Sequence, residues 1–422
     1  MTDQVIEARA SDEVVRDEVR TWLEENHDKD RPLREWRQML LDSGWGMPTF
    51  PVDWYGRGYS GALARVVAEE FRRVGARGLA GGMARRLASP TIVEHGTDEQ
   101  RRRLLTAALL GDETWCQLFS EPGAGSDLAS VTTSAVLHGD EFVIKGQKVW
   151  TSGATSDTDM GMLVCRTDWD VPKHQGISWI AFPMKQLGVE IRPLKQITGG
   201  AGFNEVFITD ARAPAANVIG GINQGWRVTT TTLAVERTGI VAVGLDESTA
   251  RRSRDSHESA DPRREEMPVR QRMPSMIDLA KEYGRNTDPV YRQEVIKHYI
   301  LSEVTRLTAE RARAERKAGR PGPEGSTTKV QWNHVARLQR VLAPSILGPA
   351  AMLVGEDAPY RGAIPLQVLS SCGPMIFAGT DEIQHNIIAE RILGLPKEPA
   401  VDLDVPFREV RTSGRRADRG SA

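Results

Sequence analysis

The sequence has 422 residues, enough for two or three domains, and 40% of them are hydrophobic, so a sizeable core is possible. Its 55 basic and 57 acidic residues nearly cancel, which gives no reason to expect a nucleic acid or a membrane surface as a partner, and no apolar run approaches the roughly 18–20 residues of a membrane span. The first ten residues lack the apolar segment of a signal peptide, and three unclustered cysteines indicate a reduced, cytoplasmic protein with neither a disulfide framework nor a metal site.

Residues 12 to about 111 have apolar side chains at the spacing of helices. Thr97, with Gln100 three residues later, is typical of a capping box, the reciprocal side-chain cap at the start of a helix. Ser89 before a proline predicts another helix start, with a serine cap and a first-turn proline. We therefore expect an N-terminal all-α domain over residues 1–115.

The stretch Gln117-Leu-Phe-Ser-Glu-Pro-Gly-Ala-Gly-Ser-Asp127 follows these helices. Its proline and two glycines end helical structure and let the backbone approach a ligand closely. Ser120, Ser126 and the neighbouring backbone N–H groups are hydrogen-bond donors in such a loop, which suits an anionic or ring-carbonyl ligand. Taken alone, the stretch is more typical of an ordinary turn with a serine cap. A second motif, Gly146-Gln-Lys-Val-Trp-Thr-Ser-Gly153, favours the ligand-binding loop.

After this loop the hydrophobic period changes to two, the period of strands. Residues 131–137 and 142–148, joined by the turn His138-Gly-Asp140, predict a hairpin. Turn residues separate the apolar runs that follow, so we expect a small β-barrel or sandwich as the middle domain, over residues 116–225. Further strands are expected at 162–166, 177–184, 189–194 and 205–209.

From Trp226 onward the pattern is helical again, and we expect a C-terminal helical bundle over residues 226–402. Residues 251–274 are charged and contain three prolines, which predicts a mobile surface loop. The last stretch, 403–422, is rich in arginine and poor in apolar residues, which favours a disordered tail over a partner-binding arm. The helices are expected at 228–245, 293–318, 329–347 and 382–395.

The Gly-rich stretch and the 146–153 motif together resemble the flavin-binding core of the acyl-CoA dehydrogenases. Gly379-Thr-Asp-Glu-Ile-Gln384 is similar to the C-terminal motif of that family, and the ending Ile387–Pro399 resembles its actinobacterial members. The resemblance covers most of the chain. It implies an α+β fold with an N-terminal helical domain, a middle β-barrel and a C-terminal four-helix bundle. It also implies FAD as the cofactor and an acyl-CoA as the substrate.

The resemblance further implies which residues form the site. Two segments would contact the flavin ring and its side chain, and the C-terminal motif would meet the flavin from the helical domain. Trp150 taken singly is also an ordinary core candidate, and Ser120 an ordinary turn cap. The implied flavin contacts are Gln117, Phe119, Ser120, Ser126, Trp150, Thr151, Ser152, Thr380 and Glu382, and the implied acyl-CoA contacts are Ser126, Arg237 and Gly379.

The general base departs from the commonest pattern of the family, which has a glutamate just before the Gly-Thr of the C-terminal motif. Ala378 stands at that position and cannot take a proton. Glu236, in Leu233-Ala-Val-Glu-Arg237, instead resembles the base of the branch that includes isovaleryl-CoA and long-chain dehydrogenases. The alternative is a solvated glutamate paired with a neighbouring arginine, which the apolar character of this helix disfavours. As a base, Glu236 would remove the α-proton of an acyl thioester.

Two motifs of the family are altered here. The Arg-x-x-Phe pattern is missing from Tyr283–Gln293, and the Gln-x-x-Gly-Gly stretch is replaced by Gln367–Gly373. The resemblance therefore leaves two assemblies open, a homotetramer or an α2β2 heterotetramer with a second acyl-CoA dehydrogenase-like subunit. It also leaves two functions open, an FAD-dependent dehydrogenase subunit or a non-catalytic partner subunit. An electron-transfer flavoprotein is the implied electron acceptor, and branched, bulky or steroid side-chain acyl groups are the implied substrates.

Overall fold

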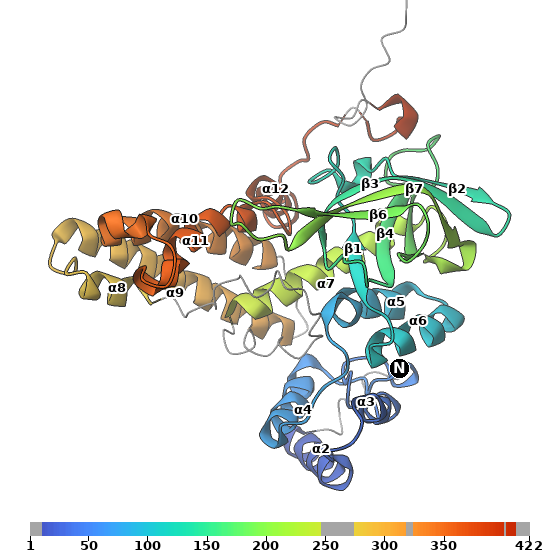
Figure 1. The fold of residues 1–422 in the computed structure, drawn as a ribbon, viewed down its shortest axis with the longest axis horizontal. Helices are drawn as coiled ribbons and strands as arrows, with labels where there is room; N and C mark the ends of the chain where they lie inside the picture. Colours follow the sequence, from blue (N-terminus) through green and yellow to red (C-terminus); the bar gives the residue numbers. More distant parts are fainter. Residues whose placement is uncertain (1–10, 246–273, 318–323, 401, 411–422) are drawn as a thin grey trace, which may run out of the picture. The chain divides into compact units, whose positions relative to one another are not determined.

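The computed structural model describes residues 11–245, 274–317, 324–400 and 402–410. The chain folds as two compact units (Figure 1). We call the first the sheet unit; it comprises Met1–Leu194, Gly202–Glu236 and Ala400–Ala422. The second, the helical unit, comprises Lys195–Ala201 and Arg237–Pro399. None of the described helices is both long and apolar enough to cross a membrane.

The N-terminal helices of the sheet unit form where the sequence predicts them. They are α2 (Asp12–Asn26), α3 (Leu33–Asp42), α4 (Gly61–Val74), α5 (Ser89–His95) and α6 (Asp98–Leu110). The capping box of α6 is confirmed: the N–H of Gln100 donates to Thr97 Oγ1 at 3.2 Å, and the N–H of Thr97 donates to Gln100 Oε1 at 2.9 Å. The predicted cap at Ser89 is wrong, because a π-helical turn over Ala84–Ala88 runs directly into α5. Ser89 Oγ instead donates to the carbonyl of Ala84 at 2.9 Å.

The middle of the chain forms one sheet. Its strands are β1 (Trp115–Leu118), β2 (Ser134–His138), β3 (Glu141–Ser152), β4 (Met160–Arg166), β5 (Ile177–Pro183), β6 (Val189–Leu194), β7 (Phe203–Pro214) and β8 (Val218–Ile219). Among the described residues the order is β6-β7-β3-β2-β4-β5-β8, and β1 pairs with β4 in parallel. The predicted hairpin is confirmed as β2 and β3, paired antiparallel with Leu137 opposite Phe142. The short strands β1 and β8 were not predicted, because neither is long enough to show a period of two.

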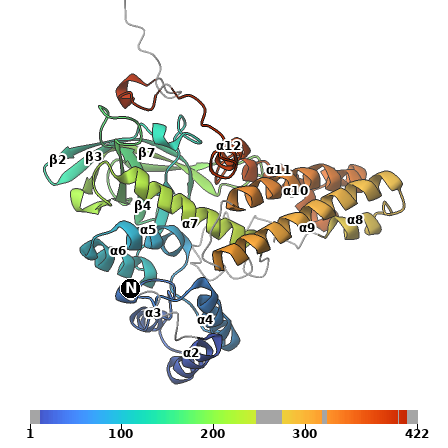
Figure 2. The same ribbon diagram turned by 180° about the vertical axis from the view of Figure 1, so that it is seen from behind.

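Strand β4 is buried along its whole length, because both faces of the sheet are covered there. Met162 and Val164 belong to the apolar cluster shared with the N-terminal helices. Leu163 and Cys165 belong to a second cluster, formed by the strands. Alternate side chains of one strand therefore enter two different cores. Figure 2 shows α5 and α6 beside the sheet, on the side that carries the first of these clusters.

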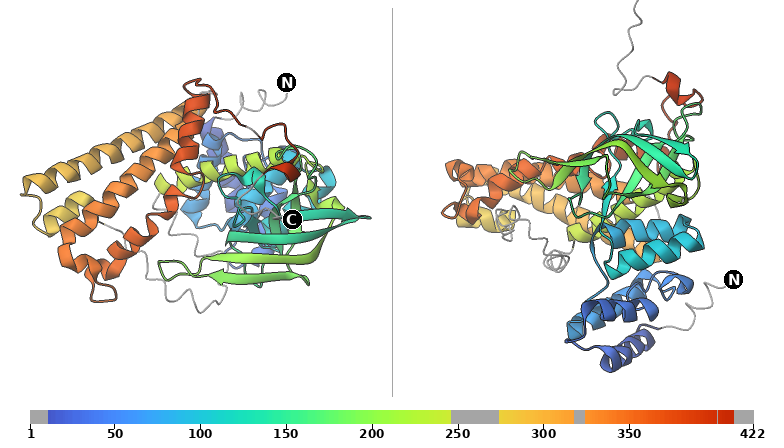
Figure 3. Two further views of the ribbon diagram at one scale, coloured as in Figure 1. Left: turned by 90° about the horizontal axis from the view of Figure 1, so that it is seen from above. Right: turned by 45° about the vertical axis from the view of Figure 1, so that its right-hand side comes forward.

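The helical unit consists of long helices, as the sequence predicts. Helix α7 (Gly225–Leu245) begins in the sheet unit and passes into the helical unit at Arg237. The other helices are α8 (Met276–Glu282), α9 (Pro289–Lys317), α10 (Glu324–Leu347), α11 (Ala363–Ser370) and α12 (Asp381–Arg391). Helices α9 and α10 lie side by side (Figure 3). The order of helices, sheet and helices confirms the predicted α+β fold class, and nearly all of the loop predicted over 251–274 lies outside the described residues.

The start of the C-terminal tail packs against the sheet unit. Phe407 has an exposed fraction of 0%, and its N–H donates to the carbonyl of Val171 at 2.9 Å. The N–H of Arg408 donates to the carbonyl of Trp169 at 3.0 Å. The prediction of a disordered tail from residue 403 therefore does not hold for residues 403–410, because Phe407 is buried and the backbone beside it is hydrogen-bonded to the sheet unit. Residues 411–422 lie outside the described part of the chain.

Candidate active site

The two motifs that the sequence singles out lie side by side in the sheet unit. Strand β1 carries Gln117 and pairs with the buried strand β4, where Gln117 is opposite Met162. The chain then enters the Gly-rich loop, and the carbonyl of Ser120 accepts a hydrogen bond from the N–H of Val149 at 2.9 Å. This bond joins the loop to β3 directly before Trp150. The backbone therefore brings residues 117–127 and 146–153 to one place.

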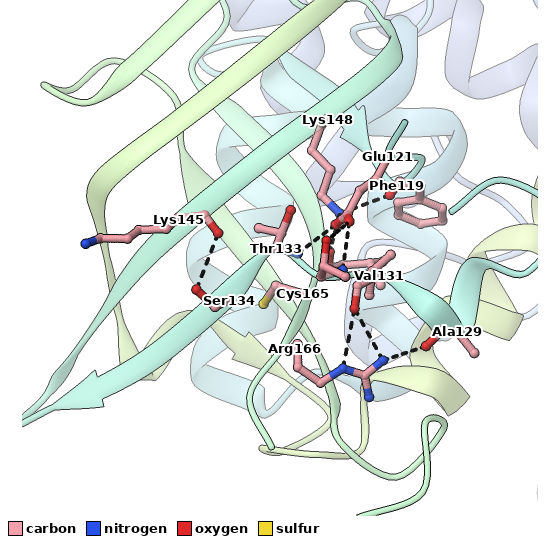
Figure 4. A network of polar contacts seen from close by, with 12 residues as sticks. Phe119, Glu121, Ala129, Val131, Thr133, Ser134, Lys145, Lys148, Cys165 and Arg166 are labelled. Carbon is pink, nitrogen blue, oxygen red and sulfur yellow. Dashed lines mark hydrogen bonds and ion pairs between the residues drawn. The ribbon is translucent and has the colours of Figure 1, made fainter. Parts of the chain in front are cut away.

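A buried ion pair lies beneath the Gly-rich loop (Figure 4). Lys148 has an exposed fraction of 0%, and Glu121, in the loop, has one of 6%. The Nζ of Lys148 lies 2.8 Å from Glu121 Oε1 and also donates to the carbonyls of Phe119, at 3.0 Å, and Val164, at 2.7 Å. These three bonds use all three donors of the ammonium group. Lys148 therefore ties the loop to both β3 and β4.

The carboxylate of Glu121 also has several hydrogen-bond donors. Its carboxylate accepts from the N–H and Oγ1 of Thr132, at 2.7 and 2.8 Å, and from the N–H of Thr133, at 2.9 Å. Burial alone would raise the pKa of Glu121, but the charge and hydrogen bond of Lys148, with the donors of Thr133 and Thr132, outweigh it and lower the pKa to about 2. Glu121 therefore stays charged and serves as a structural anchor.

Sequence reasoning did not single out Lys148, although a signal was present. Phe142 and Ile144 on β3 are both buried, and the period of a strand puts Gly146 and Lys148 on the same face. Gly146 leaves room for Thr133, since a Cβ there would lie 2.3 Å from Thr133 Oγ1. A lysine on the buried face of a strand implies a buried acceptor, and Glu121 is the one that the structure supplies.

Trp150 is held in an unusual conformation. Its φ is +58°, in the left-handed region that bulky residues rarely adopt, and it lies at an irregularity in the pairing of β3 with β7. Its side chain is 55% exposed and packs edge-on against Phe203, with ring centroids 5.9 Å apart. Trp150 is therefore not a core residue. A large apolar surface held outward by a strained backbone is a feature of binding sites.

Thr151 and Ser152 follow Trp150 on β3. Thr151 is buried, and its Oγ1 is inaccessible to solvent and has no hydrogen-bond partner among the described residues. Ser152 is half-buried. On the other side of the site, Phe119 is buried in the core and Ser126 is exposed at the end of the loop. The segment thus exposes the ring of Trp150 next to the Gly-rich loop and encloses an unpartnered hydroxyl at Thr151.

The proposed base also lies in the sheet unit. Glu236 is half-buried on α7, and its Oε2 accepts a hydrogen bond of 3.2 Å from Nε2 of Gln117, 119 residues earlier. Helix α7 is held against α5 by two further contacts, His95 Nε2 with Thr231 Oγ1 at 2.7 Å and Thr91 Oγ1 with Thr232 Oγ1 at 3.0 Å. Strand β1 and helix α7 therefore bring two predicted site residues together. The side chain of Arg237 lies outside the described part of the chain.

The remaining predicted residues lie in the helical unit. Thr380 is the N-cap of α12 and accepts from the N–H of Ile383 at 3.3 Å, while Glu382 is exposed in the first turn. Ala378 and Gly379 both have left-handed φ angles, +56° and +92°. The φ of Gly379 favours glycine, because side chains rarely adopt this backbone conformation. Flavin contacts by Thr380 and Glu382, and a substrate contact by Gly379, stay predictions.

Comparison with protein families identifies the class of protein. Models of the acyl-CoA dehydrogenase N-terminal, middle and C-terminal domains match residues 3–112, 116–211 and 269–393. The chain belongs to the acyl-CoA dehydrogenase family, whose members are oxidoreductases.

Similar proteins are found among the actinobacterial members. The acyl-CoA dehydrogenase IpdE1 of Mycobacterium tuberculosis is 34% identical over 405 residues, which cover 92% of this chain and 98% of that protein. IpdE1 of Mycolicibacterium smegmatis is 35% identical over 410 residues, covering 91% and 97%. Among solved structures, the Tcur3481-Tcur3483 steroid ACAD has a TM-score of 0.67 at 28% identity, covering 92% of this chain and 98% of that chain. The ChsE4-ChsE5 complex from M. tuberculosis has a TM-score of 0.63 at 27% identity, covering the same shares.

Proposed function

We propose that the protein is an FAD-dependent acyl-CoA dehydrogenase that forms a trans-2-enoyl-CoA, with Glu236 as the general base. The observation that carries this proposal is the hydrogen bond from Gln117 to Glu236. It puts a carboxylate from α7 beside the strand that leads into the Gly-rich loop. A base has to lie within reach of the reacting carbon, and this carboxylate bonds the first of the two motifs that would hold the cofactor.

The residues beside the loop fit a flavin. The exposed ring of Trp150 offers an apolar face. The Oγ1 of Thr151 is buried and forms no hydrogen bond with the described residues, so it could bond a ligand. When bound, FAD supplies the acceptor for the β-hydride of the substrate. The residues that would hold it are Gln117, Phe119, Ser120, Ser126, Trp150, Thr151 and Ser152 from the sheet unit, and Thr380 and Glu382 from the helical unit.

The proposed reaction depends on one proton transfer. The α-proton of a thioester is only weakly acidic, so donors to the thioester carbonyl have to stabilise the enolate-like charge as the proton leaves. Glu236 would take that proton on a carboxylate oxygen. The amide of Gln117 donates to Oε2 and so fixes the rotamer of the carboxylate and favours its charged, basic form. Ser126, Arg237 and Gly379 are the proposed contacts of the acyl-CoA.

A second candidate is a non-catalytic partner subunit. Two observations favour it: Ala378 occupies the commoner base position, and one solved structure similar to this chain is a complex of two named proteins, ChsE4 and ChsE5. We propose a tetramer in either case, of four copies or of two copies each of two subunits. An electron-transfer flavoprotein is the proposed acceptor, and branched or steroid side-chain thioesters are the proposed substrates.

The Glu236→Gln variant separates these functions. It keeps the size of the side chain and its capacity to bond Gln117 but removes its basicity. We expect flavin content to be unchanged and flavin reduction by an acyl-CoA, followed by stopped-flow absorbance, to fall by roughly two to four decades. The matched control is Glu24→Gln, at an exposed glutamate of α2. Reduction at the wild-type rate would exclude Glu236 as the base.

The substrate panel should contain straight-chain, branched and steroid side-chain thioesters. The purified wild-type protein could reduce its flavin with none of these thioesters but gain this activity with a second subunit. In that case the wild-type protein and Glu236→Gln are compared in the complex. If Glu236→Gln leaves the rate of flavin reduction in the complex unchanged, this chain is favoured as the non-catalytic partner subunit. Ala378→Glu combined with Glu236→Gln tests whether a carboxylate at the commoner position restores part of the rate.

A further inference from the structure

A second buried cation, Arg166, lies where three distant segments of the sheet unit meet. Its exposed fraction is 0%, and its guanidinium donates to the carbonyl of Ala129 at 2.5 Å (Figure 4). The guanidinium also donates to the carbonyl of Lys173 at 2.6 Å. It also donates to Val131 O at 3.4 Å. The ring of Phe407 covers the guanidinium, with the ring centroid 3.8 Å from Cζ. Arg166 therefore joins the end of the Gly-rich loop to the loop between β4 and β5, and the C-terminal segment closes over it.

The C-terminal segment, Asp402–Val410, is fixed by several independent contacts. Besides the two backbone bonds to Val171 and Trp169, the ring of Phe407 packs on the ring of Trp169, with centroids 5.5 Å apart. Arg408 forms an ion pair with Asp170 at the surface. The segment thus covers residues 169–172 of the loop between β4 and β5. Phe407 is buried in this contact.

Lys173 connects this segment to the Gly-rich loop. Its ammonium lies 2.8 Å from a carboxylate oxygen of Asp402 and 3.0 Å from one of Asp127, and the side chain is only 12% exposed. Asp127 Oδ2 also accepts from Ser130 Oγ at 2.5 Å. One lysine therefore bridges a carboxylate of the C-terminal segment and the carboxylate that directly follows Ser126.

We propose that Asp402–Val410 is an intramolecular clamp and that Lys173 is the positioning residue through which it sets the Ser126–Asp127 end of the Gly-rich loop for binding the CoA thioester. The functional consequence rests on the proposed contact between Ser126 and acyl-CoA. Lys173 itself need not touch the substrate. Because Gln117 and Glu236 belong to a different set of contacts, loss of the clamp should weaken CoA binding and leave the proton-transfer step nearly unchanged.

The test compares Lys173→Met with Lys173→Arg in the full-length protein. Lys173→Met removes the bridging charge, and because both aspartates remain accessible to solvent, the fold should persist. Lys173→Arg keeps the charge. We expect Lys173→Met to raise the Kd for coenzyme A, measured by calorimetry, by roughly fivefold, because both ion pairs of the bridge, to Asp127 and to Asp402, are lost. In turnover, KM should rise with little change in kcat. Lys173→Arg should retain most of the wild-type affinity.

Two further variants act on the clamp itself. Phe407→Ala removes its apolar anchor and should raise the Kd for coenzyme A at least as much as Lys173→Met. Arg408→Gln removes only the surface ion pair on the same segment and should leave the Kd unchanged. An equal effect of all three substitutions would mean that general destabilisation, not positioning, is measured, and would overturn the proposal.

Hydrogen–deuterium exchange makes the outcome independent of the enzyme's activity. Lys173→Met should speed amide exchange across residues 123–131 relative to the wild-type protein, whether or not coenzyme A binds. Unchanged exchange in that segment would overturn the clamp. Faster exchange with an unchanged Kd would overturn the positioning role. Failure of the wild-type protein to bind coenzyme A would instead refute the proposed function and, with it, the substrate role of the clamp.

Discussion

Glu121 and Glu236 are two carboxylates of the sheet unit with opposite surroundings. Glu121 is 6% exposed, and an ammonium and three neutral donors hold its pKa at about 2. Glu236 is half-buried and accepts from the uncharged amide of Gln117. A buried carboxylate held by a lysine is fixed in the charged state and anchors a loop. Glu236 instead accepts from a neutral donor of β1, and its place beside the Gly-rich loop suits it to take a proton rather than to anchor a loop.

The largest effect on stability should come from breaking the anchor. Lys148→Met leaves the charge of Glu121 buried without its partner, so the free energy of unfolding should fall by about 3–5 kcal/mol in chemical denaturation. Lys145→Met is the matched control, three residues earlier on β3, where the ammonium forms an exposed pair with Asp210 at 3.0 Å. This control should change stability little, because exposed ion pairs contribute little. Equal losses in both variants would contradict the anchor role.

The same anchor predicts a dependence of stability on acid. The pKa of Glu121 is lowered in the folded protein, so its contribution is fully present above about pH 4.5 and is lost as the pH falls toward about 2. The free energy of unfolding of the wild-type protein should therefore decline across this window. In Lys148→Met the decline should be shallower, because the folded pKa of Glu121 rises. If the free energy of unfolding falls equally with pH in both proteins, Lys148 does not lower the pKa of Glu121.

A smaller effect should follow from changing the amide beside the base. Gln117→Leu removes the donor to Glu236 Oε2, so the carboxylate is no longer held in place by β1. At neutral pH, kcat/KM should fall roughly tenfold, the effect of one hydrogen bond to a charged group. Gln38→Leu is the control, since Gln38 donates to Asp42 on α3 at 2.8 Å, outside the proposed site. An unchanged kcat/KM in Gln117→Leu would mean that Gln117 does not position the base.

Local patterns predicted the elements of this fold well. Residues close together in the sequence were enough to predict the capping box at Thr97 and the hairpin of β2 and β3. The same holds for the long helices of the C-terminal part. Strand β1 was missed because four residues show no period, and because its stability comes from the parallel pairing with β4. The order of the strands in the sheet depends on contacts between distant residues and could not be read from any one segment.

The candidate site was less accessible to sequence reasoning. The two motifs identified the loop and β3, but nothing in either segment indicates that Gln117 would bond Glu236, since this contact depends on how β1 and α7 pack. The buried face of β3 could have identified Lys148. The burial of Phe407 could not have been predicted. A lone aromatic residue in a charged tail has the same local sequence pattern whether it is buried or exposed.

The central claim is that Glu236 removes the α-proton, and proton exchange tests it most directly. A suitable probe is 3-thiabutanoyl-CoA, whose β-carbon is replaced by sulfur, so that an α-proton is present but no β-hydride can leave. In D2O, NMR should show exchange of this α-proton in the presence of the wild-type protein. The account predicts that Glu236→Gln slows the exchange by roughly two to four decades, while Glu24→Gln leaves it unchanged. Exchange at the wild-type rate in Glu236→Gln would contradict the account.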